Sequence, residues 1–90
     1  MKHSTESTFW TDYDKLPVRI QRIADQQFRL MEVNPRHPSL RLKKIPGRKN
    51  VWSARVTRNY RAVATPVEGG LQWFWIGTHA EYDELLKRLR

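Results

Sequence analysis

Cysteine is absent from the 90-residue chain, so neither a disulfide nor a catalytic thiol is available to it. Its three histidines are scattered, which argues against a structural zinc site, because such sites draw on clustered Cys and His ligands. No apolar run approaches the roughly 18 residues that a membrane-spanning helix needs. Residues 1–6 also lack the apolar stretch of a signal peptide, and we therefore expect a cytoplasmic protein without a membrane partner.

Several catalytic signatures are missing as well. There is no Gly-rich phosphate loop, no carboxylate pair and no Ser-His-Asp signature, and we expect neither a metal nor another cofactor. Internal repeats and low-complexity segments are also absent. A chain this short can bury only one core, so we expect a single domain over residues 1–90, with residues 1–8 flexible.

Acidic residues are missing from one continuous third of the chain. No Asp or Glu stands between Glu32 and Glu68, whereas the same stretch carries nine of the 17 Lys and Arg residues. The nine are Arg36, Arg41, Lys43, Lys44, Arg48, Lys49, Arg55, Arg58 and Arg61. A segment of this kind indicates a surface for a polyanion, and we favour nucleic acid or an acidic protein over a merely solvated face.

Hydrophobic periodicity predicts one helix over residues 17–34, where apolar residues recur at three- and four-residue spacing. Pro17 suits the first helical position, where an amide proton would have no partner, and Asp14 is a possible cap. Pro35 disfavours the α conformation in the residue before it, so the helix ends there. The aromatic segment 9–13 fits a short strand or a helical turn, and the pattern does not decide between them.

Four later segments alternate or run apolar in the manner of strands, namely 40–45, 51–57, 60–64 and 71–76. Thr78 and Glu81 then match the capping box that opens a helix. This order predicts an α+β domain. An N-terminal helix or helical hairpin packs on a three- to four-stranded twisted antiparallel sheet, and a short C-terminal helix follows, with the helices on one face of the sheet.

The hairpin between the second and third of these strands decides where two arginines lie. A two-residue turn would place Arg61 on the apolar face. A three-residue loop pairs Val56 with Ala62 and puts Arg55 and Arg61 together on the opposite face. Because register follows the hydrophobic pattern, we expect the three-residue loop. Two guanidinium groups on one side can clamp a phosphate, and two merely exposed strand arginines are the alternative.

His79 is expected at the first helical position after the cap, with Tyr82 beside it one turn further on. The partial positive charge of a helix N-terminus favours neutral imidazole, which is a competent general base near neutral pH. Gly77, just before the helix, would let a substrate backbone approach closely. A surface histidine next to a core tyrosine is the alternative, and it stays open at this point.

Other residues of the basic stretch fit binding rather than chemistry. Lysine acts on phosphate as a point charge, so cations at the turns suit tracking of a nucleic-acid backbone. These residues are Lys43, Lys44, Arg48, Lys49 and Arg58. Three tryptophans, Trp52, Trp73 and Trp75, could stack on bases, although their strand alternation favours packing in the core.

Taken in order, several short motifs resemble the RelE/ParE toxin superfamily, whose members are the toxins of type II toxin–antitoxin modules. The motifs are Asn34-Pro35-Arg36-His37-Pro38-Ser39-Leu40, Lys43-Lys44-Ile45, Trp52-Ser53-Ala54-Arg55-Val56, Tyr60-Arg61-Ala62 and Trp73-Phe74-Trp75-Ile76-Gly77-Thr78-His79. The resemblance covers about residues 9–89. It implies a helical N-terminal part packed on a twisted antiparallel sheet.

The resemblance also implies one of two activities. RelE-like members cleave messenger RNA in the ribosomal A site without a metal, ParE-like members poison DNA gyrase, and an antitoxin wraps around both. In the ribonucleases, basic residues stand where Arg55 and Arg61 stand here. A His or Arg and a Tyr lie near the C-terminus, where His79 and Tyr82 stand. Ser53 replaces a second basic residue of some members, and the spacing from His79 to Tyr82 is shorter than usual.

We therefore expect a toxin that acts as a metal-independent, ribosome-associated mRNA endoribonuclease and so blocks translation. Its catalytic residues would be His79, Arg61, Arg55 and Tyr82, and its partners a cognate antitoxin, mRNA and the ribosome. Two alternatives remain. One is a non-enzymatic toxin that poisons DNA gyrase, and the other is an inactive relative that only binds nucleic acid.

Overall fold

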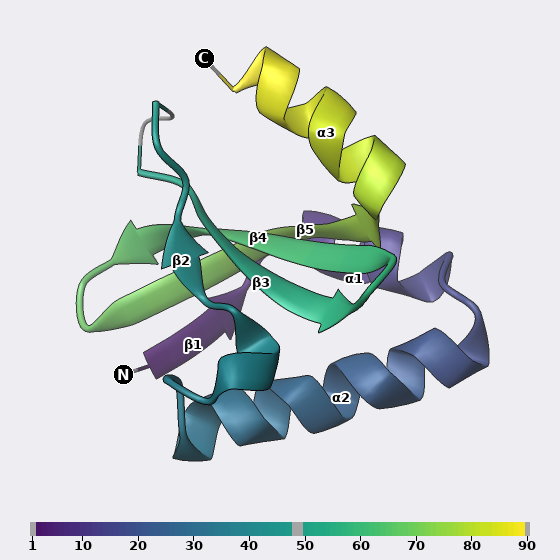
Figure 1. Ribbon diagram of the computed structural model, residues 1–90, viewed down its shortest axis with the longest axis horizontal. Coiled ribbons are helices and arrows are strands. Elements are labelled where there is room, and N and C mark those ends of the chain that lie inside the picture. Colours follow the sequence, from purple (N-terminus) through teal and green to yellow (C-terminus); the bar gives the residue numbers. More distant parts are fainter. Residues whose placement is uncertain (1, 48–49, 90) are drawn as a thin grey trace.

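A computed structural model describes residues 2–47 and 50–89, which form three helices and one five-stranded sheet (Figure 1). The helices are α1 (Ser7–Asp14), α2 (Val18–Val33) and α3 (His79–Arg88), with a 3₁₀ turn, η1 (Pro38–Leu40). The strands are β1 (Lys2–Thr5), β2 (Lys43–Lys44), β3 (Trp52–Thr57), β4 (Tyr60–Val67) and β5 (Gly70–Thr78). Their order in the sheet is β1-β5-β4-β3-β2, and all neighbours are antiparallel except β1 and β5. The predicted α+β class is confirmed.

Residues Lys2–Thr5 form a strand within the segment 1–8, for which no element was expected. Lys2–Thr5 pair in parallel with Gly70–Trp73, and this fifth strand exceeds the three or four expected. The two backbones approach so closely that a Cβ atom at Gly70 would collide with the backbone of Lys2. Only glycine leaves room for β1 at this position.

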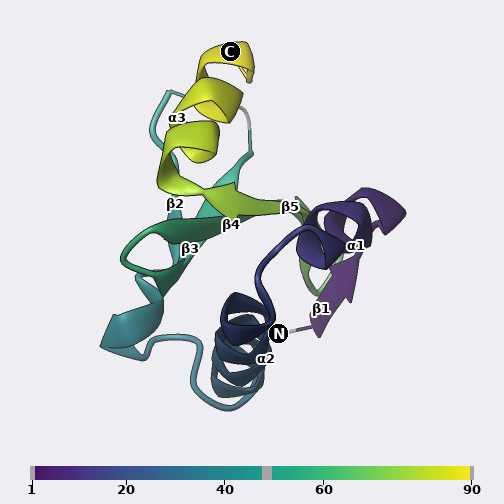
Figure 2. The ribbon, with the colours of Figure 1, turned by 90° about the vertical axis from the view of Figure 1, so that its right-hand side faces the viewer.

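The helices cover both faces of the sheet rather than one, which is a second correction (Figure 2). Ala62 and Trp73 belong to the core beneath α1 and α2, whereas Val63 packs with Tyr82 in a smaller core beneath α3. Successive side chains of a strand point to opposite faces, so β4 supports both cores. A strand covered on both faces needs a continuous apolar run, and the middles of β4 (residues 62–64) and β5 (residues 73–76) each carry one.

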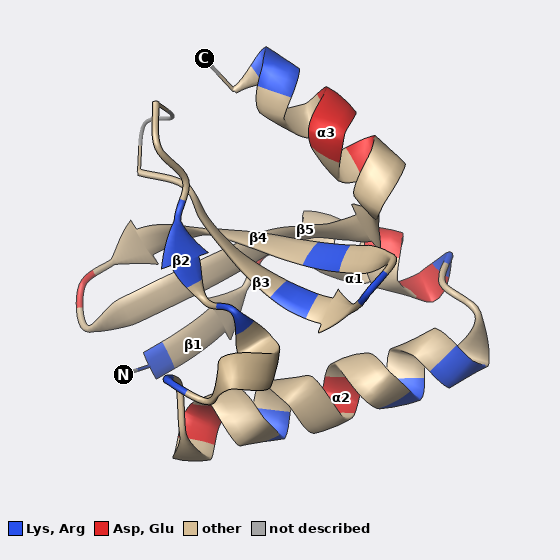
Figure 3. Ribbon diagram, viewed as in Figure 1, with Lys and Arg blue, Asp and Glu red and all other residues tan. Residues whose placement is uncertain are grey.

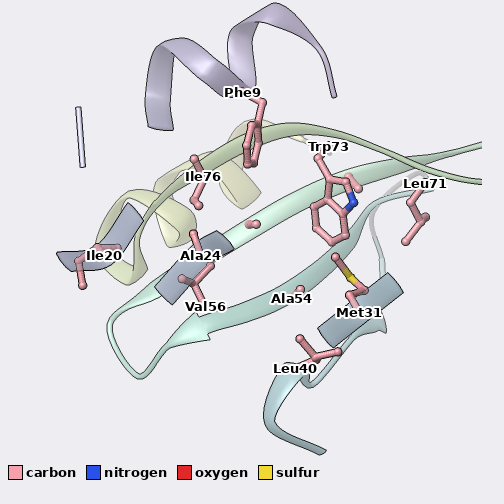
Figure 4. Packing of buried hydrophobic residues seen from close by; sticks show 12 residues of the cluster. Phe9, Ile20, Ala24, Met31, Leu40, Ala54, Val56, Leu71, Trp73 and Ile76 are labelled. Atoms are coloured by element: carbon pink, nitrogen blue, oxygen red, sulfur yellow. The ribbon is translucent and has the colours of Figure 1, made fainter. Parts of the chain in front are cut away.

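The larger core lies between α2 and the sheet (Figure 4). Helix α2 confirms the predicted helix, and its apolar stripe buries Ile20, Ala24 and Met31. Its N-cap is Pro17, and no side chain caps it, so the expected cap by Asp14 is wrong. Trp73 is completely buried against these residues, which excludes it from base stacking. Trp52 and Trp75 are partly buried and pack against the larger and the smaller core, respectively.

Helix α1 resolves the ambiguity of the aromatic segment and covers the open edge of β5 beyond β1. Phe9 is buried on its inner side, while Trp10 remains about half exposed. The Thr8 hydroxyl donates to the backbone oxygen of Phe74 at 3.0 Å. The Asp12 carboxyl accepts the backbone N–H of Ile76, and burial raises the pKa of this carboxyl. Side chains of α1 thus satisfy backbone groups that would otherwise form an exposed sheet edge.

The strand expected over residues 40–45 is reduced to the two residues of β2. Residues Pro38–Leu40 form η1 instead, capped by His37, whose Nδ1 accepts from the Ser39 backbone N–H at 3.2 Å. Leu40 is fully buried and anchors this turn to the larger core. Arg41 follows in the left-handed region with a φ of 45°, which no strand pattern can accommodate.

Candidate functional site

The β3–β4 hairpin places Arg55 directly opposite Arg61. Its turn contains two residues, Arg58 and Asn59, so the expected three-residue loop is wrong. The expected face is nevertheless right, because an irregularity in the β3 register at Val56 supplies the extra residue. The hydrophobic pattern requires an odd number of residues outside the regular pairing of β3 and β4. The turn supplies two of them, and the bulge at Val56 supplies the third.

The guanidinium of Arg61 is fixed over the hairpin turn. Its Nη1 atom donates to the backbone oxygens of Thr57 at 2.7 Å, Tyr60 at 2.9 Å and Arg58 at 3.2 Å. Burial and, after it, the positive charge of Arg55 lower the pKa of Arg61. The group still carries its charge at neutral pH, because the pKa of arginine normally lies above about 12.

The start of α3 is fixed to the same turn. Thr78 and Glu81 form the predicted capping box, in which the Glu81 carboxylate accepts the backbone N–H of Thr78 at 2.9 Å. Hydrogen bonds from the Thr78 backbone and side chain lower the pKa of Glu81. The backbone N–H of His79 donates to the oxygen of Asn59 at 2.8 Å. The cap and this bond together position His79 relative to the two hairpin arginines.

Two neighbours on α3 hold the imidazole of His79. Nδ1 lies 3.3 Å from Oδ2 of Asp83, one turn further along the helix. A carboxylate at this place favours the tautomer in which Nδ1 carries the hydrogen and donates it in a hydrogen bond to the carboxylate. In neutral imidazole the lone pair is then on Nε2. Tyr82, itself buried, meets the His79 ring edge to face with ring centroids 5.7 Å apart. The His79 side chain remains 48 % exposed, so a ligand can reach it.

A pocket of about 120 Å³ lies between the hairpin and α3. The structure brings together in it all four side chains expected to be catalytic, namely Arg55, Arg61, His79 and Tyr82. Three further side chains, Arg41, Lys43 and Ser53, complete its lining. Among the described residues that line the pocket, four are cations and none is a carboxylate, so it suits an anion. Figure 3 shows the basic segments of β2, β3 and β4 running across this part of the sheet.

Two of the remaining predicted binding residues, Lys44 and Arg58, are described and do not line this pocket. Lys44 is exposed on the edge strand β2, beside the pocket residue Lys43. Arg58 is exposed in the β3–β4 turn and lines a neighbouring cavity. Arg48 and Lys49 lie outside the described residues.

Gly77 serves packing within the chain, and the expected close approach of a substrate does not explain it. A Cβ atom there would lie 2.7 Å from the Trp75 ring and 2.9 Å from Oε1 of Glu81. Both distances are shorter than ordinary van der Waals contacts. The absence of a side chain at Gly77 therefore allows the indole ring and the capping carboxylate to occupy their places.

Sequence reasoning missed three residues of the site. Arg41 was counted in the basic stretch but assigned to a strand, and no local signal indicates its left-handed backbone. Ser53 was noted only as a departure from the family pattern, yet it is almost fully buried and lines the pocket. Asp83 could have been found, since a residue four positions after His79 on a helix shares its face.

Two kinds of site are absent from the described part of the chain. No group of three or more His, Cys, Asp or Glu side chains is arranged to hold a metal ion. No helix in the described part of the chain is both long enough and apolar enough to span a membrane.

One family model matches this chain, and several solved structures share its fold. The model of the ParE-like toxin domain matches residues 18–84. The YoeB/ParE toxin from Agrobacterium tumefaciens is 21% identical, with coverage of 88% of this chain and 99% of that one and a TM-score of 0.67. A chain of the RelB–RelE antitoxin–toxin complex from Methanococcus jannaschii is 20% identical, with coverage of 91% and 96% and a TM-score of 0.69. A chain of the E. coli DinJ–YafQ toxin–antitoxin complex is 15% identical, with coverage of 89% and 93% and a TM-score of 0.70. No curated protein sequence matches significantly.

Proposed function

We propose that this chain, which belongs to the family of ParE-like toxin domains, is a toxin that cleaves RNA without a metal. One observation carries the proposal: His79, a candidate general base, lies in the same small pocket as the guanidinium groups of Arg55 and Arg61. Cations alone would suffice to bind a polyanion. An oriented imidazole beside them adds the group that moves a proton during phosphate transfer.

The reaction that fits this pocket is attack of an RNA 2′-hydroxyl on its own 3′-phosphate. Nε2 of His79 takes the proton of the 2′-hydroxyl, while Asp83 holds the imidazole through Nδ1. The 2′-oxygen forms a bond to phosphorus, and the bond from phosphorus to the 5′-oxygen of the next nucleotide breaks. The products are a 2′,3′-cyclic phosphate and a 5′-hydroxyl end.

The cations of the pocket stabilise the charge that develops on phosphate. Arg61 is held rigidly by the turn, so it is organised before the reaction begins and favours the pentacovalent phosphate. Arg55 positions the phosphate from the opposite strand. Lys43 lines the same pocket, and we assign it the proton that the leaving 5′-oxygen requires. Tyr82 is buried beneath His79 and orients the imidazole rather than the substrate.

The fold and family support an antitoxin as partner. The similar chains from Methanococcus jannaschii and E. coli come from complexes of a toxin with an antitoxin. We propose that this chain is likewise the toxin of a toxin–antitoxin module. A cognate antitoxin of acidic, flexible character would cover the basic surface. Messenger RNA on the ribosome is the proposed target, which places the protein in the cytoplasm and makes inhibition of translation the outcome.

A gyrase-poisoning toxin is the second candidate, because the matching family model is named after ParE. Such a toxin performs no chemistry and needs no general base. His79 would then be only a residue at the start of a helix, and the basic surface would serve an acidic protein. The damage in cells separates the two functions. A ribonuclease leaves RNA fragments with 5′-hydroxyl ends, whereas a gyrase poison leaves double-strand DNA breaks that depend on gyrase.

Two variants test the proposed function directly. His79→Ala and Arg61→Ala should each abolish toxicity on induced expression, because one removes the base and the other the charge at phosphate. Both variants should still bind the antitoxin in pull-down and unfold cooperatively in urea, which shows that the fold persists. Arg88→Ala is the matched control, since Arg88 is exposed at the end of α3 and lines neither basic cavity. Full toxicity of both active-site variants would refute the assignment.

A further inference from the structure

A second basic cavity adjoins the pocket of His79. Its volume is about 590 Å³, and it lies between α2, η1 and the end of β3. It shares Arg41 and Arg55 with the first pocket and adds Arg58. Among the described residues that line it, three are arginines and none is acidic. The two cavities are therefore parts of one basic groove, and Arg41 and Arg55 lie at the boundary between them.

The sizes of the two cavities differ in a way that suits a chain of nucleotides. The pocket of about 120 Å³ can hold a phosphate with the atoms that react. It is smaller than the roughly 300–1,000 Å³ of sites that enclose a whole small ligand. The second cavity, at about 590 Å³, is larger and lies open to solvent, so it offers room for a nucleotide without enclosing it. The rest of a bound RNA must leave the first pocket, and this cavity adjoins it.

We propose that the second cavity is a subsite for the nucleotide next to the one whose phosphate is cleaved. Single-stranded RNA would then be held at two successive phosphates, one on each side of Arg41 and Arg55. A guanidinium group suits the boundary between the two cavities, because its five N–H donors lie along more than one edge of the plane and can bind two phosphates at once. The inference rests on the proposed function and extends it from a single phosphate to an oligonucleotide.

The charge of the groove supports a polyanionic ligand. After burial, the positive charges of Arg55 and Arg41 both lower the pKa of Arg61, so each of these two guanidinium groups repels that of Arg61. Neither ion pair recorded among the described residues involves an arginine of the groove. Two phosphates in succession would neutralise much of this positive charge.

The backbone of Arg41 points to the same conclusion. Its φ of 45° is uncommon for a residue with a side chain and costs about 1 kcal/mol or more. Such conformations persist where the surrounding structure fixes them, and they cluster at binding sites. Here the buried Leu40 and the capped turn η1 fix it. The result is that Arg41 lines both cavities at once.

The walls of the second cavity suit a sugar and a base. Ile23 of α2, Pro38 of η1 and Val56 of β3 supply apolar surface between the arginines. Gln27 ties α2 to β3, because its Nε2 donates to the backbone oxygen of Arg55 at 3.2 Å. The wall is thus held in place before a ligand arrives, which lowers the entropic cost of binding.

Binding of uncleavable RNA tests the subsite. A 2′-O-methyl oligonucleotide lacks the nucleophile, so the dissociation constants of a dinucleotide with one phosphate and a tetranucleotide with three can be measured by fluorescence anisotropy. The key variant is Arg58→Ala, since Arg58 lines only the second cavity, and its backbone oxygen, which binds Arg61, is kept. We expect this variant to weaken binding of the tetranucleotide about 5- to 10-fold and to leave binding of the dinucleotide unchanged. The slope of the logarithm of the tetranucleotide binding constant against the logarithm of the salt concentration should become shallower by about 0.7. The charge-matched control Arg88→Ala should change neither.

Three results would overturn the subsite. One is an Arg58→Ala variant that binds the tetranucleotide like the wild type, and another is an equal loss for both oligonucleotides. The third concerns a peptide of ten glutamates. If Arg58→Ala weakens binding of this peptide but not of RNA, the cavity is a site for an acidic protein partner. Arg61→Ala tests the proposed function separately, because this variant should weaken binding of the dinucleotide. If it does not while the Arg58 effect holds, the proposed catalytic pocket is refuted, and the second cavity is an RNA-binding site that is independent of cleavage.

Discussion

Replacement of Gly77 by alanine should destabilise the protein and disturb the start of α3. The added methyl group would lie 2.7 Å from Cζ2 of Trp75 and 2.9 Å from Oε1 of Glu81. Since carbon atoms pack best at about 3.5–4.0 Å, one neighbour must move by roughly 1 Å. The indole cannot move freely, because its ring packs within the smaller core beside Tyr82.

The magnitude follows from these two ways to relieve the contact. Forcing extra volume into a packed core costs about 1–3 kcal/mol. Displacing Glu81 instead breaks its hydrogen bonds to the backbone and hydroxyl of Thr78, and loss of a cap costs about 1 kcal/mol. Alanine regains about 0.4–1 kcal/mol by restricting the unfolded chain. We therefore expect Gly77→Ala to lower the free energy of unfolding by about 1–3 kcal/mol.

Urea unfolding followed by circular dichroism measures this change. Thr78→Ala is the companion variant, and it should lose only the capping contribution of about 1 kcal/mol. In a Glu81→Ala background the contact with the carboxylate is gone, so the methyl group at Gly77 should cost less than in the wild type. A Gly77→Ala variant as stable as the wild type would refute the packing explanation of this glycine.

Three further predictions concern protonation and positioning. His3 accepts a hydrogen bond from Nε1 of Trp73, and burial lowers the pKa of His3, so the unfolded chain binds a proton that the folded chain does not. The stability contributed by neutral His3 should be complete above about pH 6.5 and should fall as the pH drops below that value. We expect the urea midpoint of the His3→Leu variant to fall less between pH 7 and 5 than that of the wild type. Equal falls in the two proteins would contradict this role of His3. Burial raises the pKa of Tyr13 to about 12, so Tyr13→Phe should remove the latest step of the tyrosinate absorbance titration and cost about 1 kcal/mol through the lost hydrogen bond. Asp83→Asn should lower kcat for RNA cleavage roughly 3- to 10-fold with little change in KM, because Asp83 orients His79 without touching the substrate. A change in KM alone would argue against that role.

Local patterns in the sequence predicted those parts of the fold that depend on local physics. Helix α2 follows from its apolar spacing and from the prolines at its two ends. The capping box at Thr78 involves only four consecutive residues, so its signature is complete in the sequence. The shared face of Arg55 and Arg61 follows from strand alternation, which survives an error in loop length.

The parts that could not be predicted depend on distant partners or on compensating irregularities. Strand β1 has no hydrophobic pattern of its own, because it is an edge strand whose partner, β5, lies at the other end of the chain. The bulge at Val56 offsets a shorter turn, and the two changes cancel in the hydrophobic pattern. The left-handed Arg41 is imposed by η1 and buried Leu40, since arginine itself does not favour that conformation.

The candidate site shows the same division. His79, Tyr82, Arg55 and Arg61 meet because the helix cap and the shared face of the two hairpin arginines were predicted correctly, although the loop length and pairing of the hairpin were not. What joins these features is the hydrogen bond from the His79 backbone to Asn59, which sequence spacing does not reveal. The second basic cavity likewise depends on the packing of α2 and η1 against β3, which becomes visible only in three dimensions.

The central claim is that His79 cleaves RNA, and mapping of transcript 5′ ends in cells tests it most directly. Wild type and His79→Ala would be expressed for a few minutes, and RNA with 5′-hydroxyl ends would be sequenced. We predict new ends at codon-linked positions for the wild type and none for His79→Ala, although both proteins bind the antitoxin. Growth arrest by the wild type without new RNA ends, or identical ends from the variant, would contradict the account.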